Sequence, residues 1–180
     1  MMPKPYLYFL ALLTFTITAC FSDEDPLFTP AERSLPAITT EGLNTFGCYI
    51  DGELFGPLDS PGFAQDPLDA WHTLSPTFSF QVICTQFDKE SSSRKVLDLT
   101  AIFESEGTYP LRYQAIFDDN DLEWGGGYFL DTLSSHSIEI LRFDAAKAIV
   151  SGTFYFTAIA EDYSDTINVT DGRFDVIVTY

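Results

Sequence analysis

The chain has 180 residues, of which 46% are hydrophobic and 16% aromatic, and its 27 acidic and 9 basic residues give a formal net charge of −18. This length is enough for one domain with a real hydrophobic core. The negative charge repels nucleic acids and anionic lipid headgroups, so we expect no nucleic-acid partner and no phosphate-binding role.

The N-terminal segment has the organisation of a cleaved signal peptide. Lys4 is its only charged side chain, an apolar run covers residues 6–17, and Thr18-Ala19 supplies the small residues that a signal peptidase requires. The run is shorter than the ~20 residues that span a bilayer. A buried core helix is the alternative, but no comparable helical segment follows for it to pack with. The sequence therefore predicts a signal peptide over residues 1–19.

The end of this segment, Ile17-Thr18-Ala19-Cys20, resembles a bacterial lipobox. In that motif the cysteine is acylated and becomes the first residue of the mature protein, and two or three acyl chains such as palmitate anchor it stably. The following Ser22-Asp23-Glu24-Asp25 resembles the export signal that takes Bacteroidota lipoproteins to the outer face of the outer membrane. We therefore predict lipidation of Cys20, outer-membrane lipid as a partner, and display at the cell surface, with the periplasmic face as the alternative.

Residues 20–44 contain Pro26, Pro30 and Pro36 among polar residues, which predicts an extended tether. The folded domain is expected over residues 45–180. It contains two further cysteines, Cys48 and Cys84, in predicted strands. In an oxidising envelope these two form a disulfide, or each is a small buried hydrophobic residue, and the sequence leaves both alternatives open.

Short apolar alternations separated by turn residues cover the domain. Asp51-Gly52 between strands 45–50 and 53–55 is a strong hairpin signal, because both central residues of such a turn need positive φ. Residues 56–76 are predicted to be an irregular loop, with at most one helical turn, and a second Asp-Gly turn is expected at Asp171-Gly172. Further strands are predicted over residues 77–87, 96–103, 108–111, 112–117, 128–132, 137–143, 149–160, 166–170 and 173–180.

No segment has sustained helical periodicity, so the fold class is all-β. About ten short strands predict an antiparallel β-sandwich, with a β-barrel as the alternative. In the long strand 149–160, Phe154 and Phe156 are expected to face the core and Tyr155 the other side. The final strand lacks proline and alternates strongly, which predicts a position inside a sheet.

Four blocks of the domain are distinctive as a set. They are residues 44–55, which begin Asn44-Thr45-Phe46-Gly47-Cys48 and contain Asp51-Gly52, then Ile140-Leu141-Arg142-Phe143-Asp144, then Ser151-Gly152-Thr153-Phe154-Tyr155-Phe156, and then Val169-Thr170-Asp171-Gly172-Arg173-Phe174-Asp175-Val176. Together they resemble a Bacteroidota lipoprotein family of unknown function, in which an N-T-F-G-C segment runs into an N-G or D-G turn. The resemblance covers residues 44–180 and implies a β-rich envelope lipoprotein, without an established activity, cofactor or catalytic residue.

The two histidines, His72 and His136, are predicted to lie in surface loops or turns. A serine and an acid near either histidine would suit hydrolysis, but the sequence has no G-x-S-x-G elbow. It also has no H-x-H, H-E-x-x-H or Cys/His cluster for a metal. No catalytic residue and no cofactor are therefore expected.

The calcium candidate is Asp118-Asp119-Asn120-Asp121, because calcium takes several oxygen ligands from such loops. Leu122 and Glu123 occupy positions where an EF-hand needs Asp or Asn and then Gly. A solvated hairpin loop is therefore predicted in place of a metal site.

Two aromatic residues in the predicted loops, Trp71 and Trp124, are candidates for glycan binding, with an aromatic cap on the sandwich as the other interpretation. Asp131-Thr132-Leu133 and Asp165-Thr166-Ile167 resemble the O-glycosylation motif of exported proteins in this phylum. Thr132 and Thr166 are the corresponding acceptors, and we expect Thr166 to lie at a turn with room for a glycan.

These features predict a non-catalytic, lipid-anchored β-domain that binds a protein or glycan or serves structurally. The alternatives are a carbohydrate-binding accessory module and a small envelope hydrolase.

Overall fold

Regular structure in the computed structural model is entirely β-strand within the residues it describes, which are 33–58, 66–73, 79–87, 93–112, 116–119 and 127–180. The strands are β1 Thr45–Ile50, β2 Glu53–Phe55, β3 Leu68–Thr73, β4 Ser79–Phe87, β5 Arg94–Ile102, β6 Gly107–Tyr109, β7 Ile116–Asp119, β8 Gly127–Leu130, β9 Ser137–Asp144, β10 Ile149–Ala160 and β11 Thr166–Ile177. No helix of this part of the chain is long and apolar enough to cross a bilayer.

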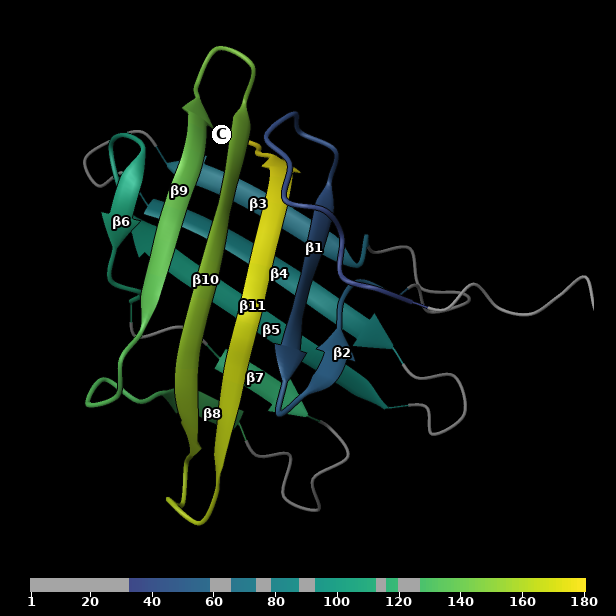
Figure 1. Cartoon of the computed structure of the whole chain (residues 1–180), viewed down its shortest axis with the longest axis vertical. Helices are drawn as coiled ribbons and strands as arrows, with labels where there is room; N and C mark the ends of the chain where they lie inside the picture. The colour runs from purple at the N-terminus through teal and green to yellow at the C-terminus, as the bar shows by residue number, and fades with distance from the viewer. Residues whose placement is uncertain (1–32, 59–65, 74–78, 88–92, 113–115, 120–126) are drawn as a thin grey trace, which may run out of the picture. The chain divides into compact units, whose positions relative to one another are not determined.

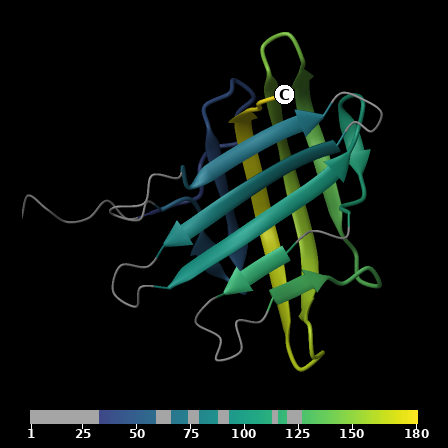
Figure 2. The same ribbon diagram turned by 180° about the vertical axis from the view of Figure 1, so that it is seen from behind.

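The strands form two facing layers, joined through β10. The first sheet has the order β6-β9-β10-β11-β1-β2, and the second has the order β8-β7-β5-β4-β3. The beginning of β10 pairs with β9, and its last residues, Ala158 to Ala160, pair with β8. The strands of the two layers cross obliquely (Figures 1 and 2). The predicted antiparallel sandwich is thus confirmed, and the alternative of a closed barrel is not.

The two Asp-Gly pairs have different structures. Asp51 (φ 48°) and Gly52 (φ 87°) form the predicted two-residue hairpin between β1 and β2. The prediction of a second turn at Asp171-Gly172 is wrong, because β11 runs without interruption through both residues. Asp171 (φ 52°) lies at a β-bulge, where the pairing of β10 with β11 shifts register between Phe154 and Phe156. Asp171 at this bulge has the left-handed backbone that a hairpin turn also needs, so an Asp-Gly pair occurs in both.

The irregular loop predicted over residues 56–76 is also corrected, because it contains strand β3. Ala70 and His72 face the core, while Asp69 and Thr73 face solvent. β3 pairs with β4 along its whole length. The prolines around this segment and a histidine at an inward position hide its alternation in the sequence.

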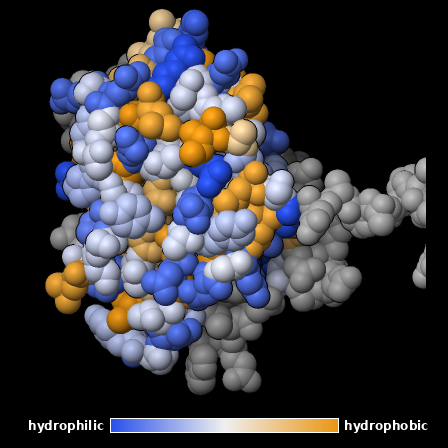
Figure 3. Space-filling model, in the orientation of Figure 1, coloured by the Kyte–Doolittle hydropathy of each residue, from blue (hydrophilic) through white to orange (hydrophobic). Residues whose placement is uncertain are grey.

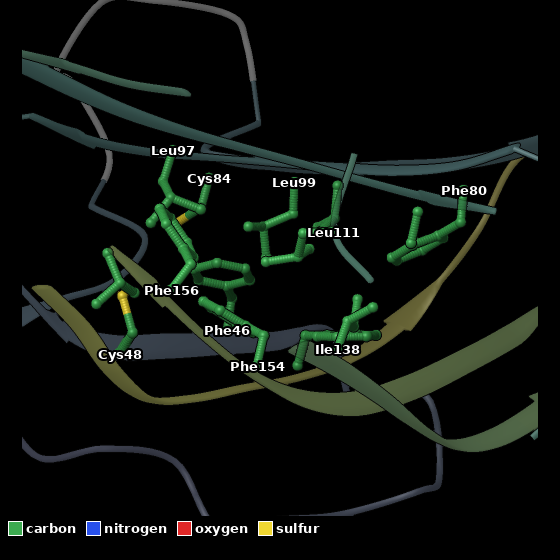
Figure 4. Close-up of a cluster of buried hydrophobic side chains, with 14 of the residues drawn as sticks. Phe46, Cys48, Phe80, Cys84, Leu97, Leu99, Leu111, Ile138, Phe154 and Phe156 are labelled. Atoms are coloured by element: carbon green, nitrogen blue, oxygen red, sulfur yellow. The ribbon is translucent and has the colours of Figure 1, made fainter. Parts of the chain in front are cut away.

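The core lies between the sheets and is rich in aromatic residues (Figure 4). Phe154 and Phe156 of β10 are buried and Tyr155 is exposed, as predicted. Phe80 of β4 stacks on Phe174 of β11, with ring centroids 5.3 Å apart, and so joins the two layers. Replacing such a phenylalanine with alanine typically costs about 3–5 kcal/mol of stability.

Residues 33–44, which we call the strap, run over the outer face of β11 and β1 (Figure 1). The sequence assigned residues 20–44 to a tether, whereas the packed unit begins at Arg33. Gly47 of β1 permits this close approach, because a Cβ atom there would lie 2.8 Å from Cδ of Pro36. The preceding residues 1–32, with Cys20, lie outside the described part of the chain.

Asp175 of β11 holds the strap. Its side chain is on the outer face of the first sheet but is buried, with 1% of the residue exposed. Its carboxylate accepts hydrogen bonds from Thr39 Oγ1 (2.7 Å) and from the backbone N–H groups of Glu41 (2.9 Å), Gly42 (2.7 Å) and Leu43 (3.3 Å). Burial alone would raise the pKa of Asp175, but these hydrogen bonds favour the charged form and lower it below its ordinary value.

We predict that Asp175→Asn will lower the free energy of unfolding by about 1–3 kcal/mol, because it removes the charge from a buried acceptor. Since the folded-state pKa of Asp175 is lowered, its stabilisation is complete above the ordinary value of 3.8 and is lost as the pH falls through the folded value. Denaturant unfolding at neutral and acid pH measures both effects, and hydrogen exchange should show faster exchange at residues 41–43. Asp171→Asn, an exposed position on the same strand, is the control. Equal effects of the two substitutions would contradict the role of Asp175.

Candidate functional site

The outer face of the first sheet has a groove of about 470 Å³. Its floor consists of residues of β9, β10 and β11, β6 contributes one side, and Ile38 of the strap contributes to the other. The lining mixes polar and apolar side chains, and Figure 3 shows this mixture over the same face. This outer-face groove is the candidate functional site.

Strand register brings four polar side chains into one row across the groove. Thr108 of β6 pairs with Glu139 of β9, Glu139 pairs with Thr153 of β10, and Thr153 pairs with Arg173 of β11. Residues that are paired across antiparallel strands project from the same face, with Cβ atoms ~5 Å apart. The row therefore offers a carboxylate, two hydroxyls and a guanidinium group to one ligand.

The β-bulge lies beside this row. Tyr155 pairs with Ser137 on β9 and is 47% exposed, and Asp171 and Gly172 line the groove with it. Gly172 is required here, because a Cβ atom at this position would lie 2.5 Å from the ring of Phe154. Bulges commonly re-aim side chains beside functional sites. This bulge brings a half-exposed phenol and an acidic residue to the same end of the groove.

Arg173 is held in place by backbone carbonyls. Its Nε atom donates to the carbonyl oxygen of Asp171 (3.1 Å), and its Nη1 atom donates to the carbonyl oxygen of Pro36 in the strap (3.3 Å). Carbonyl groups orient a guanidinium without neutralising it. Arg173 is thus a fixed cation in the groove, with further N–H groups for a ligand.

A second hollow, of about 310 Å³, lies between the β1–β2 hairpin, β5, β8 and the start of β11. Its lining includes Asp51, Glu53, Lys95 and Asp165. Two of these acids already serve the fold: Asp51 Oδ1 accepts from the N–H of Asn168 (2.8 Å), and Asp165 Oδ2 accepts from the Tyr128 hydroxyl (2.9 Å). This hollow is therefore the weaker candidate.

His72 lies in the core, contrary to the prediction of a surface position. It is 1% exposed, and its ring centroid lies 5.0 Å from that of Phe143 and 5.4 Å from that of Phe103. Burial lowers its pKa from the ordinary value of 6.5. A neutral histidine enclosed by aromatic rings of the core has no route to a substrate.

His136 lies in the connection between β8 and β9, as predicted for a surface residue, and its Nδ1 atom is 2.9 Å from the carbonyl oxygen of Ser134. The hydroxyl of Ser134 donates instead to Asp131 Oδ2 (2.6 Å). In a hydrolytic triad the serine hydroxyl must bond the histidine, with the acid on its other side. This turn has the three residue types in the wrong connectivity.

Cys48 of β1 and Cys84 of β4 come from opposite sheets and are buried in the same part of the core (Figure 4). The structure contains them as free thiols. Burial raises the pKa of Cys48 to about 12, and burial together with the nearby Cys48 raises the pKa of Cys84 well above 9. Both thiols are therefore protonated and unreactive toward exposed electrophiles.

The other candidates from the sequence are not brought together. Trp71 lies half-buried on the outer side of β3, in the second sheet, while Trp124 lies outside the described residues. Asp118 and Asp119 belong to β7, while Asn120 and Asp121 also lie outside the described residues. Among the residues that were described, no group of three His, Cys, Asp or Glu side chains could hold a metal ion.

The two O-glycosylation candidates differ in accessibility. Thr132 is exposed in an ordered turn, and the next residue, Leu133, is 97% exposed. Thr166 is exposed at the start of β11, but its neighbour Ile167 is 6% exposed in the core. A glycosylating enzyme that must also bind the residue after the acceptor can reach Leu133, beside Thr132, but cannot reach Ile167, beside Thr166.

Sequence patterns missed Glu139, Arg173 and Asp171 as site residues. The alternation of β10 indicated that Tyr155 faces away from the core, but nothing local indicates its neighbours. Their proximity depends on the register of strands that are distant in the sequence.

Comparison with protein-family models, with curated proteins and with solved structures finds no match. The resemblance to a Bacteroidota lipoprotein family thus stays a prediction.

The buried His72 predicts a specific pH dependence. Because the pKa of His72 is lowered in the folded state, only the unfolded chain takes up this proton as the pH falls below 6.5, and stability should decrease toward acid pH. We expect His72→Phe to reduce this loss and His136→Gln to leave it unchanged, as measured by urea unfolding at several pH values. An NMR titration of the folded protein should give a midpoint for His72 below 6.5, and a midpoint at or above 6.5 would contradict this prediction.

Proposed function

We propose that this chain is a lipid-anchored envelope lipoprotein whose β-sandwich is a non-catalytic binding domain, with the outer-face groove as its binding site. The signal segment and the lipobox ending in Cys20 support the anchor. The acidic Ser22-Asp23-Glu24-Asp25 supports display on the cell surface. The partner is a protein or glycan that meets the groove outside the membrane.

The observation that carries the binding role is the groove itself. A half-exposed Tyr155, the immobilised Arg173 and the row through Glu139 and Thr153 converge on one concave surface, as expected of a recognition site. The described histidines offer no nucleophile or base to this surface, since His72 is in the core and His136 is not among the residues that line the groove. A carbohydrate-binding accessory module is the second candidate, favoured by Tyr155, and a hydrolase receives no such support.

The anchor has a direct test. We expect Cys20→Ala to abolish labelling by radioactive palmitate and to move the protein out of the membrane fraction, because the thioether acceptor is missing and each buried methylene contributes ~0.8 kcal/mol to membrane binding. Ser22→Ala, two residues along and with the thiol intact, is the matched control and should keep the label. Unchanged labelling and membrane retention of Cys20→Ala would overturn the anchor.

Photo-crosslinking in intact cells tests the binding role. A photoreactive amino acid in place of Tyr155 should give envelope adducts, because this position faces the groove. The same replacement at Tyr163, a 78% exposed residue in the β10–β11 turn, should give few. Adding Arg173→Gln should diminish the adducts at position 155. Equal adduct yields at both positions, unaffected by Arg173→Gln, would contradict a binding site in the groove.

A further inference from the structure

We infer that the outer-face groove binds a neutral oligosaccharide. One sugar ring packs against Tyr155, and the hydroxyl groups of the sugar form hydrogen bonds with Glu139, Thr153 and Arg173. This inference rests on the proposed function, in which the groove is the binding site, and names its ligand class.

The size and lining of the groove suit a short glycan. Its volume of about 470 Å³ is within the range of ~300–1,000 Å³ that small-molecule sites occupy. The two large hydrophobic side chains exposed in it are Tyr155 (47%) and Ile38 (55%), and the row beside them is polar. A pyranose has the same two-sided character, because its C–H face is apolar and its edge carries hydroxyls.

The hydrogen-bonding inventory of the groove also matches sugar hydroxyls. The carboxylates of Glu139 and Asp171 only accept hydrogen bonds, the guanidinium of Arg173 only donates, and Thr108, Ser137 and Thr153 do both. A hydroxyl group donates one hydrogen bond and accepts others, so each lining group can be satisfied by the same ligand. A purely apolar ligand would leave these groups unpaired, at a cost.

Charge distinguishes a neutral glycan from an acidic one. The groove lining contains two carboxylates, Glu139 and Asp171, and one cation, Arg173, and the whole chain has a formal net charge of −18. A uronic acid or a sulfated sugar would be attracted by Arg173. It would be repelled by the carboxylates of Glu139 and Asp171 and by the negative field of the whole chain. A neutral oligosaccharide has no such penalty.

A peptide partner is disfavoured because the groove lies on the face of a sheet. β10 is paired with β9 on one side and with β11 on the other, so its backbone groups are used in these ladders. An extended peptide gains most of its affinity by adding to a free sheet edge. In this groove, side chains must therefore provide the recognition. The side chain of Arg173 is already fixed by the carbonyls of Asp171 and Pro36. The strap is fixed by its hydrogen bonds to Asp175. Such preorganisation reduces the entropy lost on binding a flexible glycan.

The test is isothermal titration calorimetry of the full chain in detergent against neutral hexasaccharides of β-1,4-glucan, α-1,4-glucan, β-1,4-xylan and β-1,4-mannan. We expect at least one to bind, Tyr155→Ala to weaken it about tenfold, which is 1.4 kcal/mol, and Tyr155→Phe to retain most of the affinity. Arg173→Gln should also weaken binding, because it removes hydrogen-bond donors from the groove. Tyr163→Ala is the matched control for a lost exposed tyrosine, and Arg94→Gln on β5 is the control for Arg173→Gln. Thermal unfolding of each variant confirms that it is folded.

Three outcomes would overturn the inference. The first is that no neutral hexasaccharide binds at millimolar concentration. The second is that binding is equally strong in Tyr155→Ala and wild type. The third is that oligogalacturonate or an envelope peptide binds more tightly than the neutral hexasaccharides and loses affinity in Tyr155→Ala. Under any of these outcomes, crosslinking from position 155 in cells would still support the binding role. Equal crosslinking at positions 155 and 163 would remove that role itself.

Discussion

The strap and the groove both depend on one buried carboxylate. Asp175 lies in β11, a central strand of the first sheet, yet its side chain points away from the core and into the strap. Left uncovered, it would be an ordinary surface acid. Covered by residues 39–43, it satisfies three backbone N–H groups that have no strand partner. The strap can therefore lie on the sheet as irregular chain, and it carries Ile38 into the groove.

The same interaction links the fold to the proposed recognition. Arg173, two residues before Asp175, donates to the carbonyl of Pro36, so the strap positions the cation as well as the groove wall. Arg142 of β9 adds a hydrogen bond to the carbonyl of Thr40 and an ion pair with Asp144 (2.7 Å). The groove is thus framed by residues whose positions are set by hydrogen bonds outside the ligand site. Such supporting contacts are what keep a binding surface in shape without a ligand.

Alternation of side chains predicted most of the strands, because a half-buried strand needs period two regardless of its partners. It failed where the physical signal is ambiguous. Asp-Gly favours left-handed backbone and so cannot distinguish the hairpin at Asp51 from the bulge at Asp171. His72 looked like a polar loop residue because its burial depends on Phe103 and Phe143. The strap looked like a tether because its partner, Asp175, is distant in the sequence. The groove was unpredictable for a similar reason, since its row of residues exists only through strand register.

The position of β11 between β10 and β1 has a consequence for folding kinetics. β1 pairs with β2 and with β11, which are respectively its nearest and its most distant strands along the chain. Closing such a long loop lowers the entropy of the chain before the contacts between β1 and β11 can form and stabilise it. Topologies with many such distant contacts therefore fold slowly. The first sheet cannot be completed until β11 is available to pair with β1, so residues 45–50 take their place in it only after residues 166–177 have come to lie beside them.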